Sequence, residues 1–108
     1  MWFRHVILIF IFSMSAFGCS QPENASKAPI ESYSAKEIYD FAEIKINGKS
    51  YVEAAEYFGD IERLYPYSEW AKRGLIMQAF SFHKAMDYAN SRSAAQRYIS
   101  FYPASEDA

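Results

Sequence analysis

Few side chains in this sequence have the type and spacing that chemistry needs. The chain has one cysteine, Cys19, and two histidines, His5 and His83, which is too few to build a histidine–cysteine metal site. His83 follows Phe82 on a predicted helix, where a packing or surface role is far more common than metal binding. We therefore predict no bound metal and no cofactor.

Four carboxylates lie between residues 53 and 62, and paired carboxylates are a common general acid and base. They are Glu53, Glu56, Asp60 and Glu62. The apolar residues of the same segment recur at helical spacing, which leaves most of these carboxylates on the solvent side. We interpret them as a solvated helix face, and we predict no catalytic residues and no enzyme activity.

Residues 1–18 have the pattern of a signal peptide. A positively charged start precedes an uninterrupted apolar run over residues 6–12. That run is too short for a spanning helix, which needs about 20 apolar residues. It fits the apolar core of a signal peptide, about 7–15 residues long. An uncleaved membrane anchor is the alternative interpretation.

Cys19 is the residue best placed for a modification. As the only cysteine of the chain it cannot form an internal disulfide, and a lone thiol directly after a signal peptide suggests a bacterial lipoprotein. Residues 16–19 (AFGC) resemble the lipobox, although leucine is usual at Ala16 and a small residue at Phe17. Small residues at 16 and 18 would also suit ordinary signal peptidase, which would leave the cysteine unmodified. We predict lipidation of Cys19 and attachment to a membrane.

Residues 19–33 read as a flexible tether, because they contain two prolines and no apolar periodicity. Without residues 1–18, which contain Arg4, the count of Lys and Arg falls from 11 to 10, against 13 Asp and Glu, so the net charge is −3. The sequence has no basic block, and we predict no binding to nucleic acid.

Four helices are predicted after the tether. Ser34 and Glu37 form a capping box before the first helix, which ends at Asn47 and Gly48, with Gly48 free to adopt the left-handed conformation. The other helices are expected at residues 51–65, 69–85 and 88–102, with Ser68 and Asp87 as caps of the last two. Pro66 and Pro103 cannot continue a helix. The third helix is apolar nearly all round, which indicates neighbours on more than one side.

The segments 51–66 and 88–103 match, since each runs from a tyrosine to a proline, and the prolines are 37 residues apart. A helical hairpin repeated at about 34 residues is typical of tetratricopeptide repeats. We predict an all-α fold of two such hairpins, at residues 34–66 and 67–108. Small residues should let the paired helices cross closely. The expected pairs are Ala42 with Ala54 and Ala79 with Ser91. A four-helix bundle with accidental similarity is the alternative.

Three segments carry a more specific resemblance. They are residues 65–73 (YPYSEWAKR), 77–85 (MQAFSFHKA) and 98–103 (YISFYP). Together they resemble the first repeats of the BamD family, the lipoproteins of outer-membrane β-barrel assembly, over about residues 34–103. The chain departs from that family at Ala85, close to the usual turn glycine, and at Asn90 and Ser91, where an acidic residue and alanine are usual. The family has about five repeats, so we expect these two to belong to a truncated array.

The resemblance implies a function in binding. It implies a lipid-anchored protein on the periplasmic face of the outer membrane, whose partners are BamA, other Bam lipoproteins and unfolded β-barrel precursors. It also implies a peptide-binding groove on the concave face. The expected lining is Tyr39, Glu43, Arg73, Ile76, Phe80 and His83. Tyr39 and Phe80 could instead simply pack between the hairpins. A tetratricopeptide scaffold for another envelope complex, or an enzyme with its active site beyond residue 108, are the alternatives.

Overall fold

A computed structural model describes residues 28–107. The predicted signal peptide, Cys19 and most of the tether lie outside this part of the chain. The described residues form a short 3₁₀-helix, η2 (Ile30–Ser32), and four α-helices. These are α1 (Ala35–Asn47), α2 (Tyr51–Leu64), α3 (Glu69–Lys84) and α4 (Tyr88–Phe101). No strand occurs in residues 28–107, and the prediction of an all-α fold is confirmed.

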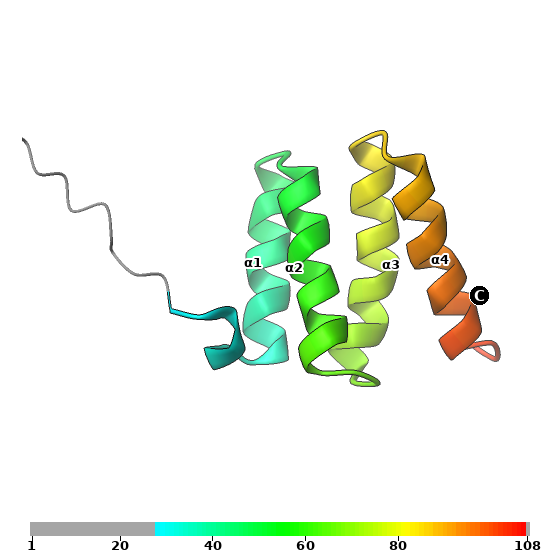
Figure 1. Cartoon of the computed structure of the whole chain (residues 1–108), viewed down its shortest axis with the longest axis horizontal. Coiled ribbons are helices and arrows are strands. Elements are labelled where there is room, and N and C mark those ends of the chain that lie inside the picture. Colours follow the sequence, from blue (N-terminus) through cyan, green and yellow to red (C-terminus); the bar gives the residue numbers. More distant parts are fainter. Residues whose placement is uncertain (1–27, 108) are drawn as a thin grey trace, which may run out of the picture.

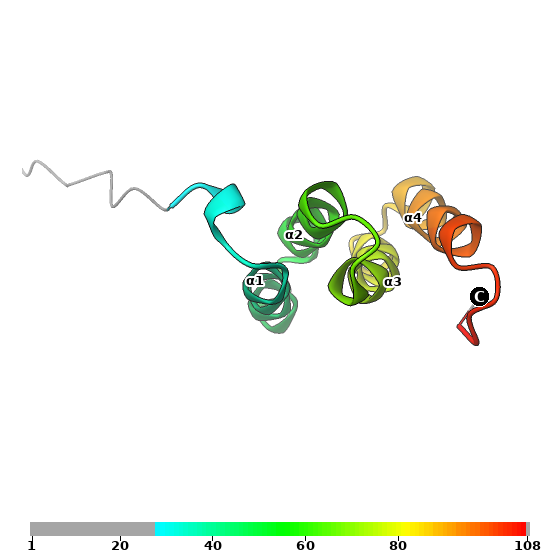
Figure 2. The same ribbon diagram turned by 90° about the horizontal axis from the view of Figure 1, so that it is seen from below.

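The four helices stand side by side and alternate in direction (Figure 1). Seen from the end, α1 and α3 form one layer and α2 and α4 the other (Figure 2). This zigzag of two hairpins is the arrangement of tetratricopeptide-like repeats. The inner helix α3 contacts α1, α2 and α4, which explains why it is apolar on several sides. None of the helices within residues 28–107 has the length and apolar character needed to cross a membrane.

The predicted helix caps are confirmed. The backbone N–H of Glu37 donates to Ser34 Oγ at 3.2 Å, and the N–H of Ser34 donates to Glu37 Oε2 at 2.7 Å, which completes the capping box. Ser68 accepts from the N–H of Ala71 at 3.0 Å, and Asp87 from that of Asn90 at 3.2 Å. These bonds satisfy N–H groups that lack a partner in the first helical turn.

The last three helices each end one residue earlier than predicted. Two of these ends precede proline: Tyr65 and Tyr102 have φ values of −129° and −131°. A residue before proline avoids the helical region because its backbone would clash with the proline ring. The third early end is at Lys84, before the turn of the second hairpin.

The hairpin turns differ from the expectation in one respect. Gly48 has a φ of −83°, so it does not adopt the left-handed conformation that the sequence suggested. Lys49 adopts it instead, with a φ of 59°, and Met86 does so in the second turn, with a φ of 61°. Their N–H groups donate to Ile46 O and His83 O at 2.9 and 3.0 Å. The two turns therefore have the same geometry, although Ala85 stands where a glycine was expected.

This assignment makes a prediction about stability. Replacing Lys49 with glycine should stabilise the protein by about 0.5–1 kcal/mol, because a left-handed φ is strained for any residue with a Cβ. The measurement is the free energy of unfolding in urea. Gly48→Ala is the matched control and should be tolerated, since a Cβ there would meet Ile44 O at an ordinary 3.6 Å. If position 48 were the one that needs glycine, Lys49→Gly would not raise the free energy of unfolding and Gly48→Ala would lower it.

The core consists of two clusters of buried side chains. The larger one joins α1, α2 and α3, and it comprises Ile38, Ala42, Ala54, Phe58, Ile61 and Ala71. The smaller one joins α3 and α4 and comprises Leu75, Ala94 and Tyr98. Ala42 and Ala54 are both fully buried, as expected for a close crossing. In the second hairpin Ser91 Oγ donates to Ala79 O at 2.7 Å, which confirms that α3 and α4 approach at this pair.

The segment just before α1 packs against the first hairpin. Tyr65 Oη donates to Tyr33 O at 2.5 Å, and the rings of Tyr33 and Phe41 lie 4.9 Å apart, edge to face. Glu31 lies 3.7 Å from the Arg63 guanidinium. The packed part of the chain therefore starts at Ile30, four residues before the capping serine.

Candidate functional site

Trp70, in the first turn of α3, is the centre of a cluster that includes two of the residues predicted for the groove. Tyr39 of α1 packs between Phe58 and Trp70, with ring centroids 5.2 and 5.1 Å away. The Arg73 guanidinium carbon lies 5.2 Å from the Trp70 ring centroid, and Lys36 Nζ lies 6.0 Å from it. Both distances fall within the range of cation–π attraction, about 6 Å.

Glu43 belongs to the same region. The pKa of the Tyr39 hydroxyl is raised, chiefly because burial disfavours the phenolate, and further because of the negative charge of Glu43. The positive charge of Arg73 acts in the opposite direction. The structure thus brings Tyr39, Glu43 and Arg73 within electrostatic range of one another at the junction of α1 and α3.

The remaining predicted residues, Ile76, Phe80 and His83, continue along α3. Their three- and four-residue spacing from Arg73 places them on one face of the helix. All three are exposed. Phe80 lies under Lys84 Nζ at 5.8 Å, and His83 meets the Tyr88 ring of α4 at 5.2 Å. The predicted residues therefore form a cluster around Trp70 and an exposed stripe that runs along α3 toward α4.

Tyr39 and Phe80 differ in whether they pack between the hairpins. Tyr39 is half-buried against rings of α2 and α3, so it has a structural role as well. Phe80 is exposed and free to contact a ligand. Sequence reasoning placed Trp70 in the apolar part of α3 and did not consider Lys36. Arg73, three residues after Trp70 and so on the same side of the helix, was the available signal in the sequence, whereas Lys36 comes from another helix.

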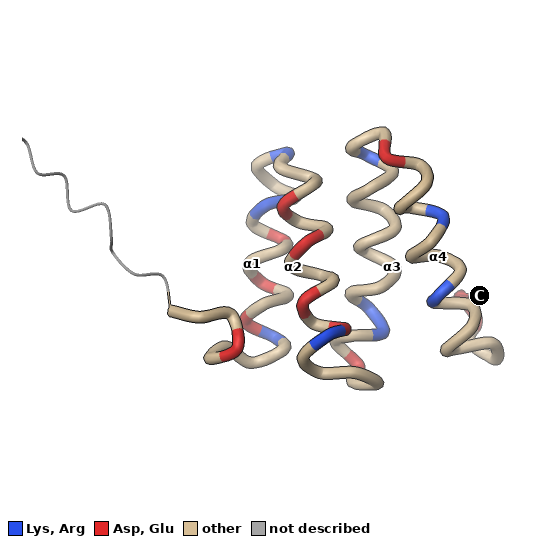
Figure 3. Tube along the Cα trace, in the orientation of Figure 1, with Lys and Arg blue, Asp and Glu red and all other residues tan. Residues whose placement is uncertain are grey.

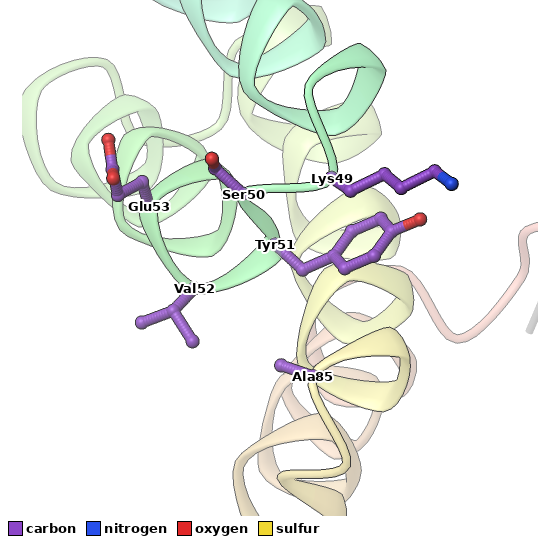
Figure 4. A pocket seen from close by; sticks show the side chains of 6 residues that line it. All are labelled: Lys49, Ser50, Tyr51, Val52, Glu53 and Ala85. Atoms are coloured by element: carbon purple, nitrogen blue, oxygen red, sulfur yellow. The ribbon is translucent and has the colours of Figure 1, made fainter.

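A shallow depression occurs elsewhere, at the hairpin turns (Figure 4). Its lining is Lys49, Ser50, Tyr51, Val52, Glu53 and Ala85. None of these residues belongs to the predicted groove. Lys49 and Tyr51 extend to one side of Ser50, and Glu53 to the other (Figure 4). The depression contains one lysine and one glutamate, without a group of side chains that converge on a single point.

The candidate face along α1 and α3 offers groups that bind. Aromatic rings supply apolar contact, and the exposed Arg73 guanidinium can hold a carboxylate with two parallel hydrogen bonds. Within residues 28–107 no three His, Cys, Asp or Glu side chains gather as they would around a metal ion. This face thus combines exposed aromatic surface with a cation.

Comparison with known proteins decides the family. The sequence profile of the YfiO family, described as outer membrane lipoprotein, matches residues 31–108, which is well over half of the chain. The chain belongs to this family. The matched part includes both helical hairpins and η2 except its first residue.

Two curated relatives are similar to the chain. The outer membrane protein assembly factor BamD of Caulobacter vibrioides is 28% identical over 98 residues, which cover 91% of this chain and 32% of the relative. The protein of the same name from Rickettsia prowazekii is 29% identical over 92 residues, covering 83% of this chain and 35% of the relative. The chain therefore spans about a third of the length of these relatives. No solved structure matches it significantly.

Proposed function

We propose that this chain takes part in the assembly of outer-membrane proteins, as a lipid-anchored protein on the periplasmic face of the outer membrane. The observation that supports this most strongly is the similarity of most of its length to two outer membrane protein assembly factors. The fold agrees with such a role, because stacked helical hairpins form extended surfaces that bind other proteins. The chain acts by binding, without a chemical step.

The proposed partners are BamA, the other Bam lipoproteins and unfolded β-barrel precursors. Affinity purification from envelopes of the native organism tests the proposal. We expect a tagged chain to recover BamA. Recovery of cell-division proteins without any barrel-assembly subunit would contradict the proposal and favour a scaffold of another envelope complex.

The face around Trp70 and along α3 is the proposed site for the precursor. An extended peptide would lay its apolar side chains on Ile76 and Phe80. A carboxylate of the peptide would meet Arg73, whose guanidinium is already oriented by the Trp70 ring. Tyr39, Glu43 and His83 border this path and would set which side chains fit.

Mutations of this face have an expected size. Arg73→Ala and Phe80→Ala should each weaken binding of a peptide from a barrel C-terminus by about 10-fold, since each removes about 1.4 kcal/mol of contact. Fluorescence anisotropy of the labelled peptide gives the Kd. Arg92→Ala, which removes an exposed arginine of α4, is the control and should leave the Kd unchanged. Equal affinity of all variants would show that Arg73 and Phe80 have no part in binding.

The anchor is tested at Cys19. Cys19→Ser should release the protein from the membrane fraction and abolish its labelling with radioactive palmitate, because the thiol is the point of attachment. Fractionation of the envelope measures both. If the parent chain and the Cys19→Ser variant both sediment with membranes and neither carries the label, the protein is not a lipoprotein.

A further inference from the structure

The end of the molecule that carries both hairpin turns has an unusual surface. This turn end, at the top of Figure 1, consists of the turns at residues 47–50 and 85–87 and the adjoining helical turns. Four large apolar side chains are exposed here. They are Ile44, Val52, Met86 and Tyr88. Each is more than half exposed, and Met86 is exposed to 77%. Burial of such side chains away from water is favourable, so this end is suited to contact another apolar phase.

The two turns are neighbours and form one surface. The depression of Figure 4 is lined by Lys49 and Val52 from the first hairpin and by Ala85 from the second. Met86 directly follows Ala85, and the Tyr88 ring packs on His83 of α3. The exposed apolar groups therefore come from both hairpins and share one end of the stack.

Two residues of these turns have a backbone conformation that is unfavourable for their residue types. Lys49 and Met86 hold the left-handed conformation, in which glycine or asparagine is usual. A Cβ there costs about 1–2 kcal/mol, and an exposed methionine recovers little of this by burial in its own fold. Tyr67, at the opposite end, has the same conformation with a φ of 63°, so this backbone feature is shared by both ends.

The charge at the turn end is weakly positive. Lys45, Lys49 and Lys84 are cations here, while Glu53 and Asp87 are the anions. Lys45 forms an ion pair with Glu53 at 2.6 Å, and Asp87 caps α4. Lys49 and Lys84 form no ion pair with a carboxylate within residues 28–107. The opposite end, at the bottom of Figure 3, carries both signs of charge. Its acidic residues in the first turns of η2, α1 and α3 are Glu31, Glu37 and Glu69, and its cations include Lys36, Arg63 and Lys72.

We propose that the turn end rests on a phospholipid surface with anionic headgroups, the apolar side chains reaching the acyl boundary and the lysines lying among the phosphates. Lysine stems can cover apolar surface while their ammonium groups stay in the headgroup layer. A lipid surface requires only apolar area and positive charge, and the turn end supplies both.

The contact is expected to be weak by itself and to depend on the anchor, so this inference rests on the proposed function. Residues 20–29, between Cys19 and η2, can extend about 33 Å, whereas α1 is about 20 Å long. Cys19 in a membrane therefore allows the far end of α1 to reach the same membrane. The anchor raises the local concentration of the lipid surface, which makes a weak second contact effective.

An environment-sensitive fluorophore tests the orientation. The full-length chain is purified from membranes and placed in vesicles of phosphatidylethanolamine and phosphatidylglycerol. One variant carries the probe at Met86→Cys and the control carries it at Tyr67→Cys, which is 78% exposed at the opposite end. We expect a blue shift and quenching by brominated acyl chains for the probe at position 86 only. Val52→Ser should reduce the shift, and 0.5 M salt should reduce it further.

The same preparation separates failure of this inference from failure of the anchor. Titration of the Cys19 thiol in the parent chain shows whether it is free. If it is free, the measurement is made in a Cys19→Ser background with excess vesicles, where the blue shift at position 86 is still expected. Equal spectra at positions 67 and 86, or a shift at 86 only when BamA is added, would overturn the proposal. Recovery of BamA in affinity purification tests the proposed function independently.

Discussion

Gly59→Ala is expected to destabilise the protein by about 1–3 kcal/mol, although alanine is the better helix former by about 1 kcal/mol. Gly59 lies inside α2, and a Cβ at this position would lie 2.7 Å from Gln78 Nε2. Gln78 is only 8% exposed, and its Nε2 donates to Ala55 O at 3.1 Å. An added methyl group would push the amide away and leave its buried N–H without an acceptor.

The amide of Gln78 has a second bond that spreads the effect. Its Oε1 accepts from Arg97 Nη2 at 2.8 Å, and Arg97 Nε donates to Glu62 Oε1 at 3.2 Å. Arg97 of α4 thus bonds both Gln78 of α3 and Glu62 of α2. Displacement of Gln78 should loosen α4 as well as the contact between α2 and α3.

Thermal or urea unfolding measures the loss, and a double substitution tests its cause. In a Gln78→Ala background the space beside Gly59 is open, so Gly59→Ala should then stabilise through its helix propensity. The sign of the Gly59→Ala effect should therefore reverse between the two backgrounds. Stabilisation in both backgrounds would mean that Gln78 adapts freely and that this network contributes little.

Much of the fold was predictable from the sequence because local chemistry determines the helix ends. Ser34, Ser68 and Asp87 cap helices because their side chains accept from a backbone N–H three residues later, a contact that involves only neighbouring residues. Pro66 and Pro103 stop helices through their own rings. The close crossings at Ala42 and Ser91 follow from small side chains at repeated positions. Such features need no knowledge of distant parts of the chain.

Other features depend on tertiary contacts and could not be predicted. The left-handed residues are Lys49, Tyr67 and Met86, whereas residue preference pointed to Gly48. The role of Gly59 depends on Gln78, which lies 19 residues later and is a polar residue buried by tertiary contacts. At the candidate site, the spacing of apolar residues placed Trp70 in the third helix. It did not predict that Tyr39, Lys36 and Arg73 surround the Trp70 ring. Which residues surround a ring is set by the angle between helices.

Phe58→Ala should remove a large share of the free energy of unfolding. The side chain is fully buried in α2, its ring lies 5.2 Å from that of Tyr39, and its Cδ1 is 3.7 Å from a Cβ built on Gly74 of α3. Truncation of a buried phenylalanine costs about 3–5 kcal/mol. A folded part of 80 residues is stable by only about 4–12 kcal/mol. The loss should appear as a large drop in the midpoint of thermal unfolding, followed by circular dichroism.

Phe101→Ala is the matched control, because Phe101 is 45% exposed at the end of α4 and should cost less than about 1 kcal/mol. Tyr98→Ala should give a third result. Tyr98 belongs to the smaller cluster, so its loss should free α4 while α1 to α3 stay folded, which hydrogen exchange would resolve. If Phe58→Ala were as mild as Phe101→Ala, the larger cluster would not hold the three helices together. Because Tyr39 packs on Phe58, that cluster also supports the candidate binding face, and only Phe58→Ala should disturb both.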